Sequence, residues 1–139
     1  MLETIVEAAK NFCIHQIDLV CKDENATIKD DMIITYITIN QNDKKYKISI
    51  AYNFDIAQHI AKLFLEEDTS DKETLIDMSL ESTNLIVGSA KVLAENSGEH
   101  FLIDTPNFVA IQHIKQVPLS KTLQKDNYKI FIAIEKIDE

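Results

Sequence analysis

Apolar side chains recur at helical spacing in three parts of the chain. The most extensive pattern lies between residues 70 and 98, where apolar or small side chains cover most of the circumference when residues are placed about 100° apart. Shorter patterns at residues 2–15 and 55–65 predict two amphipathic helices. Because so much of its surface is apolar, the long helix is expected to be mostly buried.

Both ends of the long helix carry end signals. Ser70 followed by Glu73 matches a capping box, in which each side chain satisfies a free backbone N–H of the first turn. Gly98 stands where a helix commonly ends on a left-handed residue. The sequence therefore predicts one continuous helix between these two residues.

Alternating apolar and polar residues predict strands in the rest of the chain. The final strand carries apolar side chains on both faces, so it is expected to be central in its sheet and covered on both sides. Two polar segments, residues 22–31 and 118–127, are expected to be connections. The predicted strands are residues 17–21, a hairpin of 32–40 and 45–52, residues 101–104 and 108–117, and the final strand 128–137.

This order of elements predicts an α+β fold, with helices packed on one largely antiparallel sheet. No composition shift or repeat divides the 139 residues, so a single domain spanning residues 1–139 is expected.

A narrow polar stripe interrupts the apolar surface of the long helix. It is expected to be the only solvent-facing edge of that helix, and therefore the surface that carries function. Gly88 is unusual there, because an interior helix glycine costs about 1 kcal/mol relative to alanine. It either lets another backbone approach Asn84 or allows close packing within the molecule. The stripe consists of Asp77, Glu81, Asn84, Gly88, Lys91 and Glu95.

Charge excludes one class of partner. The formal net charge is −9, and all 14 basic residues are lysines. Nucleic-acid binding requires a clustered basic surface, so it is not expected. Without arginine the chain also lacks the usual bidentate phosphate clamp. If it acts on a phosphate, its partner is expected to supply the positive charge.

The sequence contains no sign of export, membrane insertion or a cofactor of its own. No apolar run approaches the roughly 20 residues of a membrane span, and the acidic N-terminus is unlike a signal peptide, which favours a cytoplasmic location. Cys13 and Cys21 are interpreted as small buried hydrophobes. The four histidines lack metal-ligand spacing, and nucleophile-elbow and nucleotide-loop motifs are missing.

One spacing stands out in the polar stripe. Asp77 is followed after three residues by Glu81, after two more by Asn84, and after a further 21 by Pro106. Glu81 and Asn84 are therefore one above the other on one helical face. From average residue frequencies, such a match arises by chance in roughly one chain in a thousand of this size.

The run LIDMSLESTNLIVGSAKVLAE, with Pro106 at this spacing, resembles the CheX/CheC/FliY family of chemotaxis phosphatases. With a single copy of the motif the chain is most similar to the CheX type. The resemblance is specific across residues 77–106. It implies a protein phosphatase that hydrolyses the aspartyl phosphate of a CheY-like response regulator, with Mg²⁺ and a lysine supplied by the regulator. It also implies a homodimer.

The resemblance assigns a role to each motif residue. Asn84 would enter the regulator's active site and orient the attacking water, while Glu81 would pair with the regulator's lysine. Pro106 would shape the strand entry beside the helix. These roles agree with the chemistry, because phosphoryl transfer requires positioning, and a neutral amide can hold a water without repelling phosphate. The residues expected to bind the partner are Asp77, Glu81, Gly88 and Lys91.

Two other functions remain open at this point. The chain is alternatively a non-catalytic adaptor of the same fold, which binds a response regulator or a flagellar switch component. It is alternatively a structural dimerisation module, in which the motif residues form an ordinary solvated helix edge.

Overall fold

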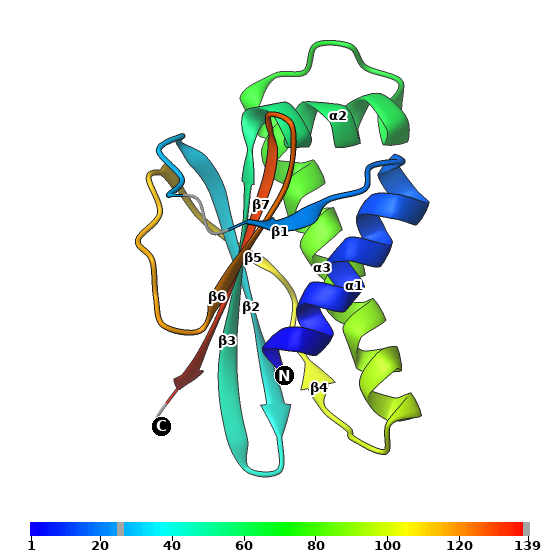
Figure 1. Ribbon diagram of the computed structural model, residues 1–139, viewed down its shortest axis with the longest axis vertical. Helices are drawn as coiled ribbons and strands as arrows, with labels where there is room; N and C mark the ends of the chain where they lie inside the picture. The colour runs from blue at the N-terminus through cyan, green and yellow to red at the C-terminus, as the bar shows by residue number, and fades with distance from the viewer. Residues whose placement is uncertain (25–26, 138–139) are drawn as a thin grey trace.

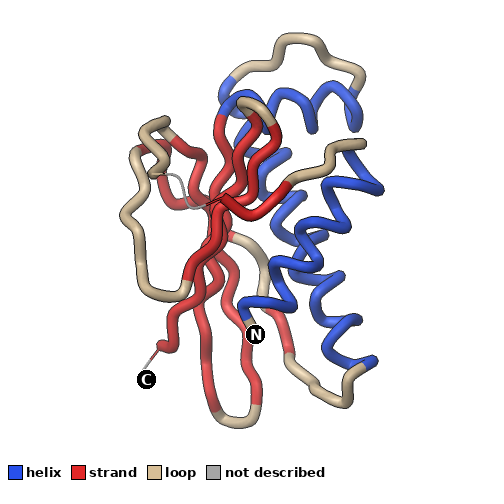
Figure 2. The backbone as a smooth tube through the Cα atoms, in the orientation of Figure 1, coloured by secondary structure: helices blue, strands red, loops and turns tan. Residues whose placement is uncertain are grey.

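Residues 1–24 and 27–137, which the computed structural model describes, form three helices and a seven-stranded sheet (Figures 1 and 2). The strand order is β1-β6-β7-β3-β2-β4, with β5 also beside β2, and each of these pairings is antiparallel. The predicted α+β architecture is therefore confirmed. The elements are α1 (Leu2–Ile17), β1 (Lys22–Glu24), β2 (Met32–Gln41), β3 (Lys44–Asn53), α2 (Phe54–Leu65), α3 (Lys72–Asn96), β4 (Leu102–Ile103), β5 (Asn107–Gln112), β6 (Ser120–Lys125) and β7 (Tyr128–Ile137).

The β2–β3 hairpin lies between the central strand β7 and the edge segments β4 and β5. Its strands pair from Met32 opposite Asn53 to Gln41 opposite Lys44. Asn42 and Asp43, which connect them, both have positive φ angles (50° and 63°), as a two-residue hairpin turn of the right twist requires. The predicted hairpin is therefore confirmed.

Strand β7 lies between β3 and β6, which confirms its predicted central place. One of its faces, with Ile130, Ile132 and Ile134, belongs to the main core beneath the helices. The other face carries Phe131 and Ala133, which pack in a second apolar cluster. The strand is therefore buried on both sides, as its apolar composition indicates.

The two faces of the sheet are covered differently. In Figure 1, α1 and α3 run side by side along one face and α2 crosses the end of the same layer. On the opposite face, Ile114 and Val117 from the segment after β5, together with Ile28, pack against Phe131 and its neighbours. Among the described residues, no helix is both long and apolar enough to cross a membrane.

The predicted strand at residues 17–21 is wrong. Ile17 is the last residue of α1, and the helix ends at Asp18, whose φ of 54° is left-handed. Leu19 and Cys21 are buried in the core, which explains the strand-like alternation. Sheet pairing begins only at Lys22, in the segment expected to be a loop, where β1 pairs with β6. Cys13 and Cys21 are free and buried, as predicted.

Two other boundaries also differ from the prediction. Residues 118–127 are not merely a connection, because β6 pairs along β7 within them. Only Thr122 and Leu123 of this strand are buried, so its sequence is polar enough to look like a loop. The strand predicted at 108–117 ends at Gln112, since the following residues leave the sheet to cover its second face.

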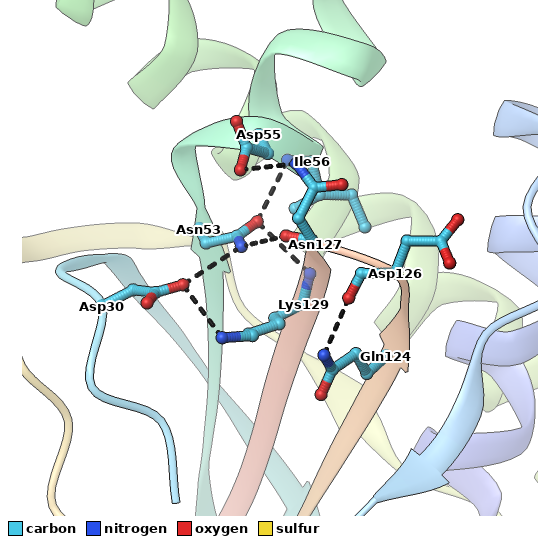
Figure 3. A network of polar contacts seen from close by, with 8 residues as sticks. All are labelled: Asp30, Asn53, Asp55, Ile56, Gln124, Asp126, Asn127 and Lys129. Atoms are coloured by element: carbon cyan, nitrogen blue, oxygen red, sulfur yellow. Dashed lines mark hydrogen bonds and ion pairs between the residues drawn. The ribbon is translucent and has the colours of Figure 1, made fainter. Parts of the chain in front are cut away.

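The start of α2 is fixed by a polar network (Figure 3). Asn53 is only 3% exposed and is the N-cap residue of α2. Its Oδ1 accepts hydrogen bonds from the backbone N–H groups of Ile56 (3.0 Å) and Lys129 (3.2 Å), and its Nδ2 donates to the Asn127 carbonyl (2.6 Å). The Lys129 ammonium, 3.1 Å from Asp30, holds the pKa of that carboxyl below its usual value. This network joins β3, α2, β7 and the loop before β2.

Candidate functional site

Helix α3 begins one residue later than its predicted cap. Asp71 is the N-cap, and its carboxylate accepts a hydrogen bond from the Thr74 backbone N–H at 2.8 Å. The predicted capping box of Ser70 and Glu73 is therefore wrong. The Ser70 hydroxyl instead donates to Glu67 at 2.7 Å, because Ser70 belongs to the turn that follows α2.

The C-terminal end of α3 is as predicted. Gly98 has a φ of 82°, and its N–H donates to the Glu95 carbonyl at 3.0 Å. The next N–H, that of Glu99, donates to the Ala94 carbonyl at 2.9 Å. These two bonds form a Schellman motif, which requires a residue that tolerates positive φ.

One long face of α3 is buried against α1, α2 and the sheet. Several of the buried residues are small, so the helix axis lies close to the strands beneath it. A helix anchored along one face gives its opposite side chains a fixed backbone from which to project. The buried residues are Leu75, Ser79, Ser82, Thr83, Ile86, Val87, Ala90 and Ala94.

The motif residues lie on the opposite side of α3. Asp77, Glu81 and Asn84 are exposed, and Gly88 and Lys91 are half-buried. Glu81 and Asn84 are separated by three residues within the continuous helix, so they are neighbours on one face. Neither side chain has a hydrogen bond or ion pair with any residue that the structure describes. Their donors and acceptors are available to an external partner.

The solvent-facing edge of α3 is wider than the predicted stripe. Leu85 is 39% exposed and Val92 is 57% exposed, although both were expected to be buried. Leu85 lies in a groove of about 280 Å³ between α1 and α3. The groove is lined by Ala8, Asn11, Phe12, His15, Gln16, Leu85 and Ser89.

Gly88 has open space in front of it. A Cβ built at this position would meet nothing within 4 Å among the described residues, apart from the local helix backbone and chain neighbours. One of the two explanations for this glycine was close packing within the molecule, and among the described residues that explanation is wrong. Approach by another molecule is the explanation that remains a prediction.

Pro106 lies in the short break between β4 and β5, along the edge of β2. Asp104 fixes this break, because its N–H donates to the Thr38 carbonyl at 3.0 Å and its carboxylate accepts from the Thr38 hydroxyl. Proline has no N–H for a sheet ladder and is tolerated at such an edge. The half-buried ring of Pro106 separates the two edge segments.

Among residues 1–24 and 27–137, no group of three or more His, Cys, Asp or Glu side chains is placed to hold a metal ion. Chemistry at the exposed stripe would have to come from the amide of Asn84 and the carboxylates of Glu81 and Asp77. The amide of Asn84 can both donate to and accept from a water molecule, and the two carboxylates can pair with cations.

The family model described as "Chemotaxis phosphatase CheX" matches residues 33–133, which is more than half of the chain. The chain belongs to the CheX family. Among curated proteins, none is a significant match. The match spans β2 to β7, and it includes α3 with its exposed stripe and Pro106.

Solved structures have the same fold as this CheX-family chain. A chemotaxis protein CheX from Vibrio vulnificus has a TM-score of 0.81 at 20% identity, covering 96% of this chain and 95% of that one. A CheC-like superfamily protein from Shewanella sp. PV-4 has a TM-score of 0.79 at 19% identity, with 99% and 97% coverage. The CheX–CheY–BeF3–Mg²⁺ complex from Borrelia burgdorferi gives 0.69 at 17% identity, with 99% and 97% coverage.

Two features near the CheX motif were missed from the sequence. Leu85 was counted in the buried apolar surface of the long helix, and the groove between α1 and α3 was not predicted, because periodicity alone does not reveal how two helices pack. The buried hydroxyl of Thr83, directly beside Asn84, was counted only as a small apolar-side residue. Its proximity to Ser79 and Ser82 on the buried face was a signal that polar contacts exist there.

Proposed function

We propose that this chain is a phosphatase that hydrolyses the aspartyl phosphate of a CheY-like response regulator. The observation that carries the proposal is the pair of free, exposed side chains Glu81 and Asn84, one helical turn apart on an anchored helix of a CheX-family chain. The solved CheX–CheY complex of B. burgdorferi, which has the same fold, supports a CheY-like partner.

In the proposed reaction Asn84 enters the regulator's active site. Its amide holds one water in line with the phosphorus, accepting from the water and donating to it or to a phosphate oxygen. The water oxygen bonds to phosphorus while the bond from phosphorus to the aspartyl oxygen breaks, which yields inorganic phosphate and a free carboxylate. The proton lost by the water goes to phosphate or solvent. No covalent intermediate on this chain is involved.

The other stripe residues bind the partner. Glu81 pairs with the regulator's lysine and thereby sets the docking angle, while Asp77 and Lys91 form the rim of the contact. Gly88 admits the regulator's surface close to the helix. The chain has no cofactor of its own in this proposal, and Mg²⁺ belongs to the regulator. We further propose a cytoplasmic location, on the sequence features given above, and a homodimer, on family resemblance alone.

The proposal is tested by phosphorylating CheY-like regulators of the source organism singly and following phosphate release with and without this chain. At least one regulator is expected to lose its phosphate faster with the chain present. If a regulator binds but keeps its phosphate for the same time, the adaptor function is correct. If none binds, even with a stable acyl-phosphate mimic, the chain is a structural module.

Glu81 is expected to contribute mainly to docking. Glu81→Gln should weaken binding of the phosphorylated regulator about tenfold, because one interfacial ion pair is lost. The advantage of the native protein should shrink as salt is raised, since screening weakens the same pair. Titration calorimetry or fluorescence at two salt concentrations measures both effects. Glu73→Gln, an exposed change in the first turn of α3, is the control, and equal losses for the two variants would contradict the assignment.

Gly88 gives a prediction in which stability and binding move in opposite directions. Gly88→Ala and Gly88→Gln should each raise the free energy of unfolding by about 0.5–1 kcal/mol, because both residues are better helix formers and meet open space. Regulator binding should weaken, and more for glutamine than for alanine. Urea unfolding and regulator titration are the two measurements. A glutamine variant that is more stable and binds normally would show that no partner approaches this position.

A further inference from the structure

Three buried hydroxyl groups join α3 to the sheet at the level of the candidate site. The hydroxyl of Thr83 on α3 lies 2.6 Å from that of Thr35 on β2 and 2.9 Å from the phenol of Tyr52 on β3. All three residues are completely buried. Thr83 immediately precedes Asn84, so this contact is made at the level of the motif.

The direction of each hydrogen bond follows from counting protons. Thr35 donates its hydroxyl proton to the Ile50 carbonyl on β3, at 2.7 Å. A hydroxyl has one proton, so Thr35 must accept from Thr83, and Thr83 must accept from Tyr52. Burial raises the pKa of the Tyr52 phenol, which therefore keeps its proton and remains a donor. The chain from Tyr52 through Thr83 and Thr35 to Ile50 is satisfied only in this order.

This network differs from the other buried hydroxyls on α3. Ser79 donates to the Leu75 carbonyl at 2.8 Å, and Ser82 donates to the Met78 carbonyl at 2.7 Å. Both bonds stay within the helix, and they move with it. The Thr83 hydroxyl is the one that is bonded to side chains of the sheet.

We propose that Thr83, held by Tyr52 and Thr35, is a positioning residue that fixes the height and rotation of α3 and thereby the place of Asn84. This inference rests on the proposed phosphatase function. A hydrogen bond requires a narrow range of distance and angle between its donor and acceptor. A shift of α3 by one residue would be 1.5 Å and 100°, and it would separate Thr83 from both partners.

The many small residues on the buried face of α3 give the hydrogen bonds of Thr83 a role in fixing the position of the helix. Four of the eight buried residues of α3 are serine or alanine (Ser79, Ser82, Ala90 and Ala94), so about half of its buried positions carry no bulky side chain to fix the helix against the strands. Buried polar groups that are fully satisfied only in one arrangement select that arrangement over others. The position of α3 affects the proposed reaction directly, because a misplacement of the Asn84 amide by about 1 Å can lower the rate on the order of a hundredfold.

The test compares Thr83→Val, Tyr52→Phe and Thr83→Ser with the controls Ser79→Ala and Ser82→Ala. For each folded variant, regulator binding and the phosphate-release rate at saturation are measured separately. Thr83→Val is expected to lower the saturating rate about tenfold or more with affinity changed less than about threefold, and Tyr52→Phe to lower it less. Thr83→Ser, which keeps the hydroxyl, should restore the rate, and both controls should resemble the native protein.

A second readout does not depend on activity. Amide hydrogen exchange of residues 83–87 in the free protein should be about tenfold faster in Thr83→Val than in Ser82→Ala, because the hold on the sheet is lost. The positioning role is overturned if folded Thr83→Val keeps its saturating rate, or if Ser82→Ala loses as much. If the native chain releases no phosphate from any regulator, the proposed function fails, and the exchange measurement alone decides whether these hydroxyls fix the helix.

Discussion

Replacing Asn84 with alanine is expected to lower the rate of phosphate release from a bound regulator about a hundredfold, because the water loses the group that orients it. Binding should change little. The exposed Asn84 amide makes no bond with the described residues of its own chain, so its removal leaves no buried group unsatisfied. Release at saturating regulator and affinity for a beryllofluoride-loaded regulator measure the two quantities.

Asn84→Asp separates the chemistry of the amide from its shape. The carboxylate has nearly the same size but would bring negative charge towards a phosphate, and it has no N–H to donate. It should therefore be as slow as Asn84→Ala and bind the phosphorylated regulator less tightly. Asn96→Ala, an exposed change in the last turn of the same helix, is the control. Release that is as fast in Asn84→Asp as in the native protein would contradict the water-orienting role.

The largest expected loss of stability comes from Asn53→Ala. The change leaves the buried N–H of Ile56, which is the capped N–H of α2, and the partly buried N–H of Lys129 without their acceptor. The lost cap bond to Ile56 costs about 1 kcal/mol and the unsatisfied Lys129 N–H about 1–3 kcal/mol, so the free energy of unfolding should fall by about 3 kcal/mol. Urea unfolding, with an unchanged dependence on urea concentration, measures the loss.

The control for Asn53 is the equivalent residue of α3. Asp71 also caps its helix, but it is exposed and its side chain bonds a single backbone N–H. Asp71→Ala should therefore cost about 1 kcal/mol. If Asn53→Ala is no more destabilising than Asp71→Ala, the network of Figure 3 does not hold β3, α2 and β7 together in the way its hydrogen bonds indicate.

Strong periodicity predicted the elements that surround the site. The alternation around the Asn42–Asp43 turn and the apolar final strand gave the centre of the sheet, and Gly98 gave the end of α3. Strand β6 was missed because only two of its side chains are buried, so its sequence is mostly polar. Its strand conformation is set by backbone pairing with its neighbours, which a polar sequence does not reveal. The strand predicted at residues 17–21 was wrong for the opposite reason. Side chains there alternate between buried and exposed, but the backbone pairs with no other strand before Lys22.

The candidate site was predicted in its residues but not in its surroundings. The spacing from Asp77 to Pro106 identified the stripe, because helical geometry places Glu81 and Asn84 together without tertiary information. The exposure of Leu85 and Val92 depends on how the neighbouring elements pack around α3, which no local pattern records. The contacts of Thr83 join residues 31 and 48 positions away, so only the folded chain brings them together.

The most direct test of the account follows radiolabelled phosphate on a CheY-like regulator mixed with a small fraction of this chain. The account predicts that each chain clears many regulators, that the label appears as inorganic phosphate and never on the chain, and that Asn84→Ala slows its release about a hundredfold. The proposed hydrolysis would be contradicted if this chain binds the regulator but the label stays on the regulator as long as it does without the chain. Transfer of the label to this chain would contradict it as well.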